Sequence, residues 1–288
     1  MIGARPERLK ELPTLRCCQI LGVSRSHLYE ALKAPETDAV ADELDQLVKQ
    51  AADDSPAYGY RRVSAKLRKK GHKKATQGRV RRRMRKLRLN RRRRPRRTRT
   101  SIPGKGPSSP NLLKEHRVDG LRQALVTDIT YVALPHGFAY VAVILDLFSR
   151  RALGWSCATS LHTELALAAI RHALACHQLP ESWIHHSDRG CQYTSQEYKD
   201  CVQAHAGRLS NSAKGNPYDN ANMESFFKTY KYEEVNLAHY DSIEDVRLSL
   251  GSFINEYNSQ RLHSSLGYCS PIEFEQLHAE LTQQVCVR

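Results

Sequence analysis

A strongly basic stretch between residues 61 and 99 sets the first limit on how this chain can fold. It holds 22 Lys and Arg residues and no Asp or Glu, whereas the rest of the chain holds 23 basic and 30 acidic residues. The formal net charge of +15 is therefore concentrated in this stretch. Such a segment can bury only a narrow apolar stripe. Nucleic acid is the natural partner of its remaining surface, because each neutralised phosphate releases condensed counterions.

Residues 59–90 have apolar positions at helical spacing, and these predict a helix-turn-helix unit. We expect the first helix to end at Gly71 and Thr76 to cap the second. The apolar residues are Val63 and Leu67 in the first helix and Val80, Met84 and Leu87 in the second. Arg and Lys fill most other positions of the second helix, as in a recognition helix that presses on phosphates. The alternative is a solvated charged face, which normally mixes both signs of charge. The candidate DNA-binding residues are Arg62, Arg79, Arg82, Arg83 and Lys86.

A further helical pair is predicted at residues 13–33, with Gly22 at the turn and Ser24 as the cap of its second helix. It is either a second helix-turn-helix or a hairpin that only packs. Residues 91–106 lack apolar periodicity and are rich in Arg, Pro and Gly, so we expect a linker there. The expected domains are an N-terminal helical segment (1–40), a basic helix-turn-helix module (41–92), a basic linker (93–118) and a catalytic core with a C-terminal helical extension (119–288).

Beyond the linker, β-branched runs alternate with helical patterns. Residues 125–159 predict three strands of an antiparallel meander. A helix at 162–178, a strand in SWIHHSD, a second helix, a strand in RLSNS and a last helix at about 221–234 follow. This order, βββαβαβα, predicts an α/β fold in which one mixed five-stranded sheet carries helices on both faces.

Three acidic residues of this domain are the candidate catalytic and metal-binding residues. Asp128 lies inside a β-branched run, where a charge is costly unless it is paired or bound to a metal ion. Asp188 ends the fourth strand, and Glu224 lies early on the last helix. The predicted sheet order would bring them to one point, where three carboxylates repel strongly without cations. Oxygen ligands favour Mg²⁺ or Mn²⁺ over zinc, and a pair of such ions is the standard arrangement for phosphodiester displacement. We expect two Mg²⁺ ions, with Mn²⁺ as a substitute.

The last helix is predicted to have two functional faces. Its buried stripe comprises Met223, Phe227 and Tyr230, while Glu224, Lys228 and Lys231 follow its flank at i, i+4 and i+7. Glu224 can then face the metal ions while the two lysines reach the DNA backbone.

Other candidate residues have alternative interpretations. Asp146 is a rival carboxylate, either a ligand or a structural partner of Arg150 or Arg151. Asp219 and Asn220 are candidate caps of the last helix.

Zinc is a weaker alternative. His185, His186 and Cys191 lie close in sequence, but adjacent histidines on a strand point to opposite faces. The eight cysteines form no CxxC pair and are typical of reduced thiols in a cytoplasmic protein. The most apolar run, residues 138–147, is half the roughly twenty residues that a membrane helix needs. We therefore expect no membrane segment and a cytoplasmic, nucleoid-associated protein.

A series of motifs resembles a known family. In order, they are VTDITYV, LDLFSR, HHSDRGCQYTS, SNSAKGNPYDNANMESFFKTYKYE and YNSQRLHSSLGYCSP. They resemble the catalytic protein (OrfB) of bacterial insertion sequences of the insertion-sequence-three family, over residues 58–274. The resemblance implies a ribonuclease H-like, retroviral-integrase-type core with a DD(35)E triad of Asp128, Asp188 and Glu224. It also implies that Lys231, seven positions after the Glu, contacts the end of the element.

The resemblance further implies a function and partners. The function is metal-dependent DNA cleavage and strand transfer at the terminal inverted repeats of an insertion sequence and into target DNA. A homo-oligomer is expected, because two ends must be joined, and so is an upstream-frame (OrfA) product or fusion. The chain departs from the family motif at Leu125 and Val126, close to where a Trp is usual, and it reads SNS where SMS is common.

Two other functions stay open at this point. One is a catalytically silent DNA-binding regulator of transposition with the same fold. The other is a structure-selective ribonuclease, which activity on an RNA/DNA hybrid would reveal.

Overall fold

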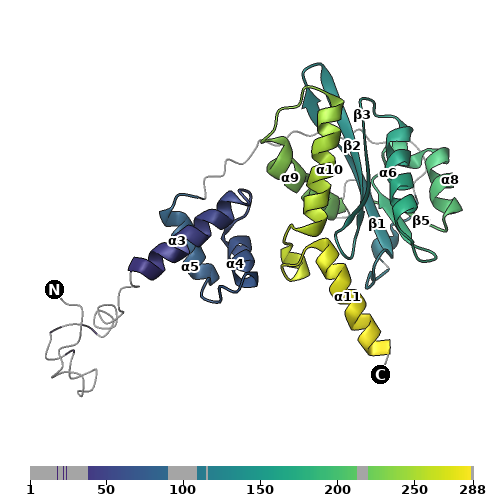
Figure 1. The fold of residues 1–288 in the computed structure, drawn as a ribbon. Helices are drawn as coiled ribbons and strands as arrows, with labels where there is room; N and C mark the ends of the chain where they lie inside the picture. Colours follow the sequence, from purple (N-terminus) through teal and green to yellow (C-terminus); the bar gives the residue numbers. More distant parts are fainter. Residues whose placement is uncertain are drawn as a thin grey trace. The chain divides into compact units, whose positions relative to one another are not determined.

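The computed structural model describes residues 38–89, 109–114, 116–212 and 220–286, together with the single positions Cys18, Gly22 and Ser24. The chain divides into two compact units, Met1–Arg93 and Arg94–Arg288 (Figure 1). Most of the helical pair predicted at residues 13–33 lies outside the described residues. The boundaries of the four predicted domains stay a prediction.

The first unit contains three helices in its described part: α3 (Asp38–Asp53), α4 (Tyr60–Lys69) and α5 (Gln77–Lys86). Gly71 follows α4 with φ +93°, a left-handed conformation that favours glycine and ends the helix there. Thr76 takes the N-cap position of α5, but its side chain makes no capping hydrogen bond. The core of the unit includes Val63, Leu67, Val80 and Met84, each at most 2% exposed, whereas Leu87 is only half-buried at the end of α5.

The second unit is built on one five-stranded sheet in the order β3-β2-β1-β4-β5. The strands are β1 (Ala124–Leu134), β2 (Gly137–Asp146), β3 (Ala152–Ala158), β4 (Ile184–Ser187) and β5 (Arg208–Asn211). β1 pairs antiparallel with β2 and parallel with β4, and β4 pairs parallel with β5. The predicted mixed sheet and its strand order along the chain are therefore confirmed, and the fold is ribonuclease H-like.

Helices cover both faces of the sheet, and the period-two alternation along β2 shows why (Figure 1). Val141, Val143 and Leu145 pack on one face against α9 (Ala221–Tyr230) and α10 (Ile243–Ser259). Ala142 and Ile144 pack on the other face against α6 (Thr163–Cys176) and α8 (Gln196–Ala204). Each face thus has its own apolar core. A short helix α7 (Cys191–Thr194) precedes α8.

The close contact of β3 with α6 depends on Gly154. A Cβ at this position would lie 2.4 Å from the carbonyl oxygen of Ala169, so no larger residue fits. Strand and helix therefore pack backbone to backbone here.

The C-terminal part of the unit extends beyond the sheet. A π-helical turn η4 (Lys231–Val235) continues α9, so the last predicted helix changes its winding before it ends. Ser242 and Asp245 form a capping box at the start of α10. The helix α11 (Pro271–Cys286) projects from the core (Figure 1). The remaining short elements are the 3₁₀ turns η2 (Leu112–Lys114) and η5 (Ser264–Leu266). None of the helices in the described part of the chain combines the length and apolar character that a bilayer span requires.

Candidate active site

Asp128 lies in the middle of β1, paired in register with Val143 of β2. Its Oδ1 accepts a hydrogen bond from the backbone N–H of Ile129 at 2.8 Å. Burial, with the negative charges of Asp188 and Glu224, raises the pKa of Asp128 to about 7, against the opposing effect of its hydrogen bonds. The topology thus brings the three acids close enough for their charges to interact.

Asp188 follows β4 directly, and the parallel register of β4 with β1 sets its level on the sheet. Val126 pairs with His186, so Asp188 comes level with Asp128 two positions later. Its Oδ1 accepts a hydrogen bond from the N–H of Gly190 at 2.8 Å, and a Cβ at Gly190 would lie 3.0 Å from that oxygen. Burial raises the pKa of Asp188. The turn therefore holds the carboxylate tightly and leaves little space beside it.

Glu224 lies in the first turn of α9, and its side chain is 37% exposed. Its Oε2 is 3.1 Å from Nζ of Lys228, one turn further along the same helix. The buried stripe of α9 is as predicted, with Met223, Phe227 and Tyr230 at most 7% exposed. Glu224 and Lys228 thus share the open flank of the helix.

The donor chemistry of these residues fits hard divalent cations. Three carboxylates supply only oxygen ligands, which suit Mg²⁺ or Mn²⁺ better than zinc. A cation would also favour the charged form of Asp128, which burial and the other two acids disfavour. In the described residues, no group of three His, Cys, Asp or Glu side chains is close enough to hold a metal ion. The role of Asp128, Asp188 and Glu224 as metal ligands stays a prediction.

Asn220 is a site residue whose role the sequence did not predict. It occupies the N-cap position of α9, as expected, but its side chain makes no capping hydrogen bond. Instead its Nδ2 donates to Oδ2 of Asp128 at 3.1 Å. Asp219, the other expected cap, lies outside the described residues. No local signal could have revealed this contact, because its two partners are 92 positions apart.

Lys231 lies with its Nζ 4.3 Å from the centroid of the Tyr131 ring, a cation–π contact with β1. Its side chain is half-buried, and burial lowers its pKa. The contact places this lysine beside the strand of the first acid. Its contact with DNA stays a prediction, as does that of Lys228.

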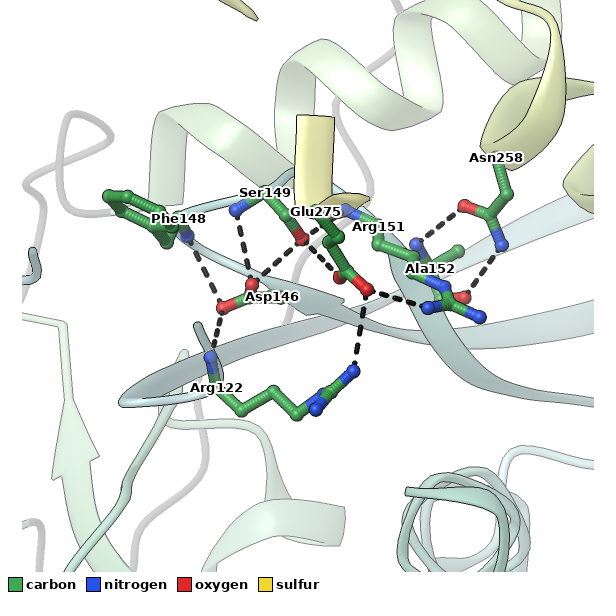
Figure 2. A network of polar contacts seen from close by, with 8 residues as sticks. All are labelled: Arg122, Asp146, Phe148, Ser149, Arg151, Ala152, Asn258 and Glu275. Atoms are coloured by element: carbon green, nitrogen blue, oxygen red, sulfur yellow. Dashed lines mark hydrogen bonds and ion pairs between the residues drawn. The ribbon is translucent and has the colours of Figure 1, made fainter. Parts of the chain in front are cut away.

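Asp146, the rival carboxylate, is fully buried in a separate network (Figure 2). It accepts hydrogen bonds from three backbone N–H groups, those of Arg122, Phe148 and Ser149, and its Oδ2 is 2.8 Å from the Ser149 hydroxyl. Burial raises its pKa. These contacts give Asp146 a structural role.

Glu275 of α11 joins this network, and it is the carboxylate that pairs with Arg151 (Figure 2). Arg151 lies 2.6 Å from Glu275, and Arg122 lies 3.3 Å from it. The Ser149 hydroxyl is 2.9 Å from the same carboxylate. Arg151 therefore pairs with a residue of the C-terminal helix and not with Asp146, whereas Arg150, the other expected partner, lies close enough to Asp146 for the two charges to interact.

The two adjacent histidines of β4 do not form a joint ligand set. His185 contacts the Tyr198 hydroxyl on one face of the sheet. His186 contacts the hydroxyls of Ser210 and Ser212, at 2.8 and 3.1 Å. Both rings are buried, so each is used in packing and hydrogen bonding.

Four of the five predicted DNA-binding residues of the first unit lie on α5, and the fifth, Arg62, lies on α4. Arg79, Arg82, Arg83 and Lys86 line a hollow of about 220 Å³. Asp45 of α3 lies 3.5 Å from Arg83 and 2.8 Å from Lys86, so it partly offsets the positive charge there.

Aromatic rings are interleaved with these cations. Arg62 packs over the Tyr58 ring at 5.4 Å, and Arg61 and Arg81 both pack over Tyr60. The concentration of cations fits a polyanion, and the individual DNA contacts stay a prediction.

Two curated relatives align with more than half of the chain. The transposase for insertion sequence element IS904 of Lactococcus lactis subsp. lactis (strain IL1403) is 35% identical over 178 residues, which cover 61% of this chain and 70% of that protein. The chain belongs to the insertion-sequence-three family of transposases. Transposase InsF for insertion sequence IS3A of Escherichia coli (strain K12) is 40% identical over 171 residues. That alignment spans 59% of each protein.

Family models match both units. The model "Integrase core domain" matches residues 121–217, and a second model with the same description matches residues 206–271. The model "HTH-like domain" matches residues 39–97. Membership of this family and the integrase core indicate a DDE-type polynucleotidyl transferase that functions in DNA transposition. Integrase-type cores in general depend on divalent metal ions. These matches do not favour the catalytically silent regulator.

Solved structures with a related fold include retroviral integrases. One is the simian T-cell lymphotropic virus intasome in complex with PP2A regulatory subunit B56 gamma, 16% identical with a TM-score of 0.45, covering 61% of this chain and 59% of that one. Another is the HTLV-2 integrase catalytic core domain in complex with magnesium, 15% identical with a TM-score of 0.39, covering 54% of this chain and 97% of that one.

Proposed function

We propose that this chain cleaves DNA at the ends of an insertion sequence and joins the freed ends to target DNA, with Asp128, Asp188 and Glu224 as catalytic residues. The observation that carries the proposal is that Asp128 lies buried within reach of the charges of Asp188 and Glu224, and that burial, followed by these charges, raises its pKa to about 7. Three interacting carboxylates on an integrase core are suited to bind divalent cations.

The same three carboxylates would hold two Mg²⁺ ions, or Mn²⁺ as a substitute. When bound, the ions would supply activation of water or of a DNA 3′-hydroxyl and stabilisation of the leaving oxygen. Around them, the Gly190 N–H orients Asp188, and Asn220 holds one oxygen of Asp128. Lys231 and Lys228 lie on the flank of the same helix region, where a DNA backbone would approach.

The substrate side of the proposal rests on the basic first unit and on family membership. Arg62, Arg79, Arg82, Arg83 and Lys86 would bind the terminal inverted repeats. A homo-oligomer would bring two ends together, and an upstream-frame (OrfA) product or fusion would add DNA-binding capacity. Acting on bacterial DNA, the protein would work at the nucleoid.

The test is a joining assay on a supercoiled substrate that carries the ends of the element, with Mg²⁺. Asp128→Asn and Glu224→Gln remove a charge with little change of shape, and each is expected to lower joining by about 1,000-fold or more while DNA binding in a gel shift is retained. Asp200→Asn, on an exposed acid of α8, is the matched control and should join normally. Joining by the Asp128→Asn protein at the unsubstituted rate would refute the assignment.

A further inference from the structure

Asn211 at the end of β5 is a buried amide whose side chain contacts two distant parts of the chain. It is 6% exposed. Its Oδ1 accepts a hydrogen bond from the backbone N–H of Ser109 at 2.8 Å. Its Nδ2 lies 3.1 Å from both the Ser187 hydroxyl and the carbonyl oxygen of Asp188. One side chain thus joins the backbone of the second acid to residue 109.

The residues on either side of Asn211, Ser210 and Ser212, reinforce this connection. Ser210 accepts a hydrogen bond from the N–H of Leu112 at 3.0 Å and contacts the His186 ring at 2.8 Å. The N–H of Ser212 donates to the carbonyl of Ser187 at 3.0 Å. Residues 210–212 therefore lie between the strand end that carries Asp188 and residues 109–112.

Residues 109–112 are the first part of the second unit that the structure describes. The chain before them leads back to the basic helical unit. A hydrogen bond to Ser109 therefore fastens the core at the point where the polypeptide arrives from the predicted DNA-binding module.

The effect on Asp188 follows from the positions of its fixed atoms. The Gly190 N–H holds its carboxylate, and Asn211 holds its carbonyl oxygen. Fixing both ends of the residue limits rotation about its backbone and side-chain bonds, and this is what a metal ligand needs for a defined geometry. The β4–β5 ladder ends at Ser187 and Asn211, so the carbonyl oxygen of Asp188 is held by side chains instead: the Ser187 hydroxyl donates to it at 3.0 Å, and the Asn211 amide binds both that hydroxyl and the carbonyl oxygen.

We propose that Asn211 is a positioning residue for Asp188, which couples the orientation of this acid to the chain segment that enters the core at Ser109. The proposal rests on the proposed function, because that function assigns Asp188 to metal binding.

The test compares Asn211→Leu with a matched control in the full chain. Leucine has nearly the shape of asparagine but makes no hydrogen bonds. Asn258→Leu is the control, because Asn258 is also a buried amide (8% exposed) with both side-chain polar atoms bonded, at 2.9 Å each, to the backbone of Ala152. Asn258 connects α10 to β3, far along the sheet from Asp188. Asn211→Leu removes three side-chain hydrogen bonds and Asn258→Leu removes two.

Two readouts are measured on each protein. Mn²⁺ binding is followed by electron paramagnetic resonance without DNA, and the exchange of the backbone amides of residues 109–114 is followed by mass spectrometry. We expect Asn211→Leu to weaken Mn²⁺ binding at least about fivefold and to speed exchange, while Asn258→Leu leaves both unchanged. Faster exchange with unchanged Mn²⁺ affinity in Asn211→Leu would overturn the proposal, because Asn211 would then be structural only.

Ser109→Pro tests the coupling to the entering segment separately from the positioning of Asp188. It removes the N–H that donates to Oδ1 of Asn211 and leaves the Asn211 side chain intact. We expect at least about twofold weaker Mn²⁺ binding. Unchanged affinity would overturn the coupling to the entering segment. Failure of the unsubstituted protein to bind Mn²⁺ at all would instead overturn the proposed function, and this proposal with it.

Discussion

The amide of Asn220 donates to the carboxylate of Asp128 across 3.1 Å, so α9 begins with a hydrogen bond to the strand of the first acid. Glu224 lies one turn further along the same helix. This bond therefore links the helix of the third acid to β1. It also stabilises the charged form of Asp128, since it opposes the rise of that residue's pKa.

Replacing Asn220 by Ala tests this link. A hydrogen bond to a charged group contributes about 1.5–3 kcal/mol, so we expect the rate of DNA joining to fall by about 10- to 100-fold while DNA affinity is retained. Asn255→Ala, at an exposed position of α10, is the control and should leave the rate unchanged. An unaltered joining rate in Asn220→Ala would show that the bond does not serve catalysis.

The ion pair between Glu224 and Lys228 predicts that replacing the lysine strengthens Mn²⁺ binding and weakens DNA binding. Both side chains are more than a third exposed, so Lys228→Ala should change the free energy of unfolding by less than about 0.5 kcal/mol. The Lys228 ammonium group competes with a metal ion for the Glu224 carboxylate. Its loss should tighten Mn²⁺ binding about two- to threefold without DNA, whereas DNA binding at low salt should weaken. Calorimetry and gel shifts measure the two affinities, with Lys199→Ala of α8 as the control. Weaker Mn²⁺ binding would contradict the competition.

The Glu275 network predicts that α11 is held to the core by a charged contact (Figure 2). Glu275→Ala would leave the guanidinium groups of Arg122 and Arg151, each about a quarter exposed, without this carboxylate. We expect a loss of about 2–3 kcal/mol in the free energy of unfolding, measured by urea titration. Glu280→Ala, at an exposed position of the same helix, should change it by less than about 0.5 kcal/mol. Equal effects of the two substitutions would exclude a specific role for Glu275.

The buried His185 predicts a pH dependence of stability. Burial, with a smaller effect of His186, lowers the pKa of His185 from 6.5 to about 3, so the folded state keeps this ring neutral. The unfolded state binds a proton below pH 6.5 and the folded state does not. The free energy of unfolding should therefore fall by about 1.4 kcal/mol per pH unit as the pH decreases from 6.5 toward 3, and should be insensitive to this group above 6.5.

The comparison for this prediction is the double variant His185→Phe with Tyr198→Phe, which replaces the buried pair by apolar rings of similar size. Urea titrations between pH 4.5 and 7.5 give the slope of stability against pH for each protein. The double variant should show the shallower slope below pH 6.5. Identical slopes would mean that His185 does not contribute to acid unfolding.

The periodic parts of the fold were predictable from the sequence because burial imposes a local pattern. Val63, Leu67, Val80 and Met84 repeat at helical spacing and are all buried. The order of β-branched runs and helical patterns along the chain likewise predicted a mixed sheet with helices on both faces, and each face has an apolar core. The assignment of the three acids, which stays a prediction, came from motifs whose order along the chain resembles that of the family.

The contacts that complete the site have no such pattern, because each joins residues far apart in the chain. Asn220 reaches Asp128 across 92 positions, Ser109 reaches Asn211 across 102, and Ser149 reaches Glu275 across 126. Asn220, expected only as a helix cap, supports the first acid, while Asn211 and Glu275, for which the sequence suggested no role, connect to the second acid and anchor α11. Local propensity depends on neighbouring residues, whereas a hydrogen-bond partner depends on which strands and helices pack together, and only the folded chain decides that.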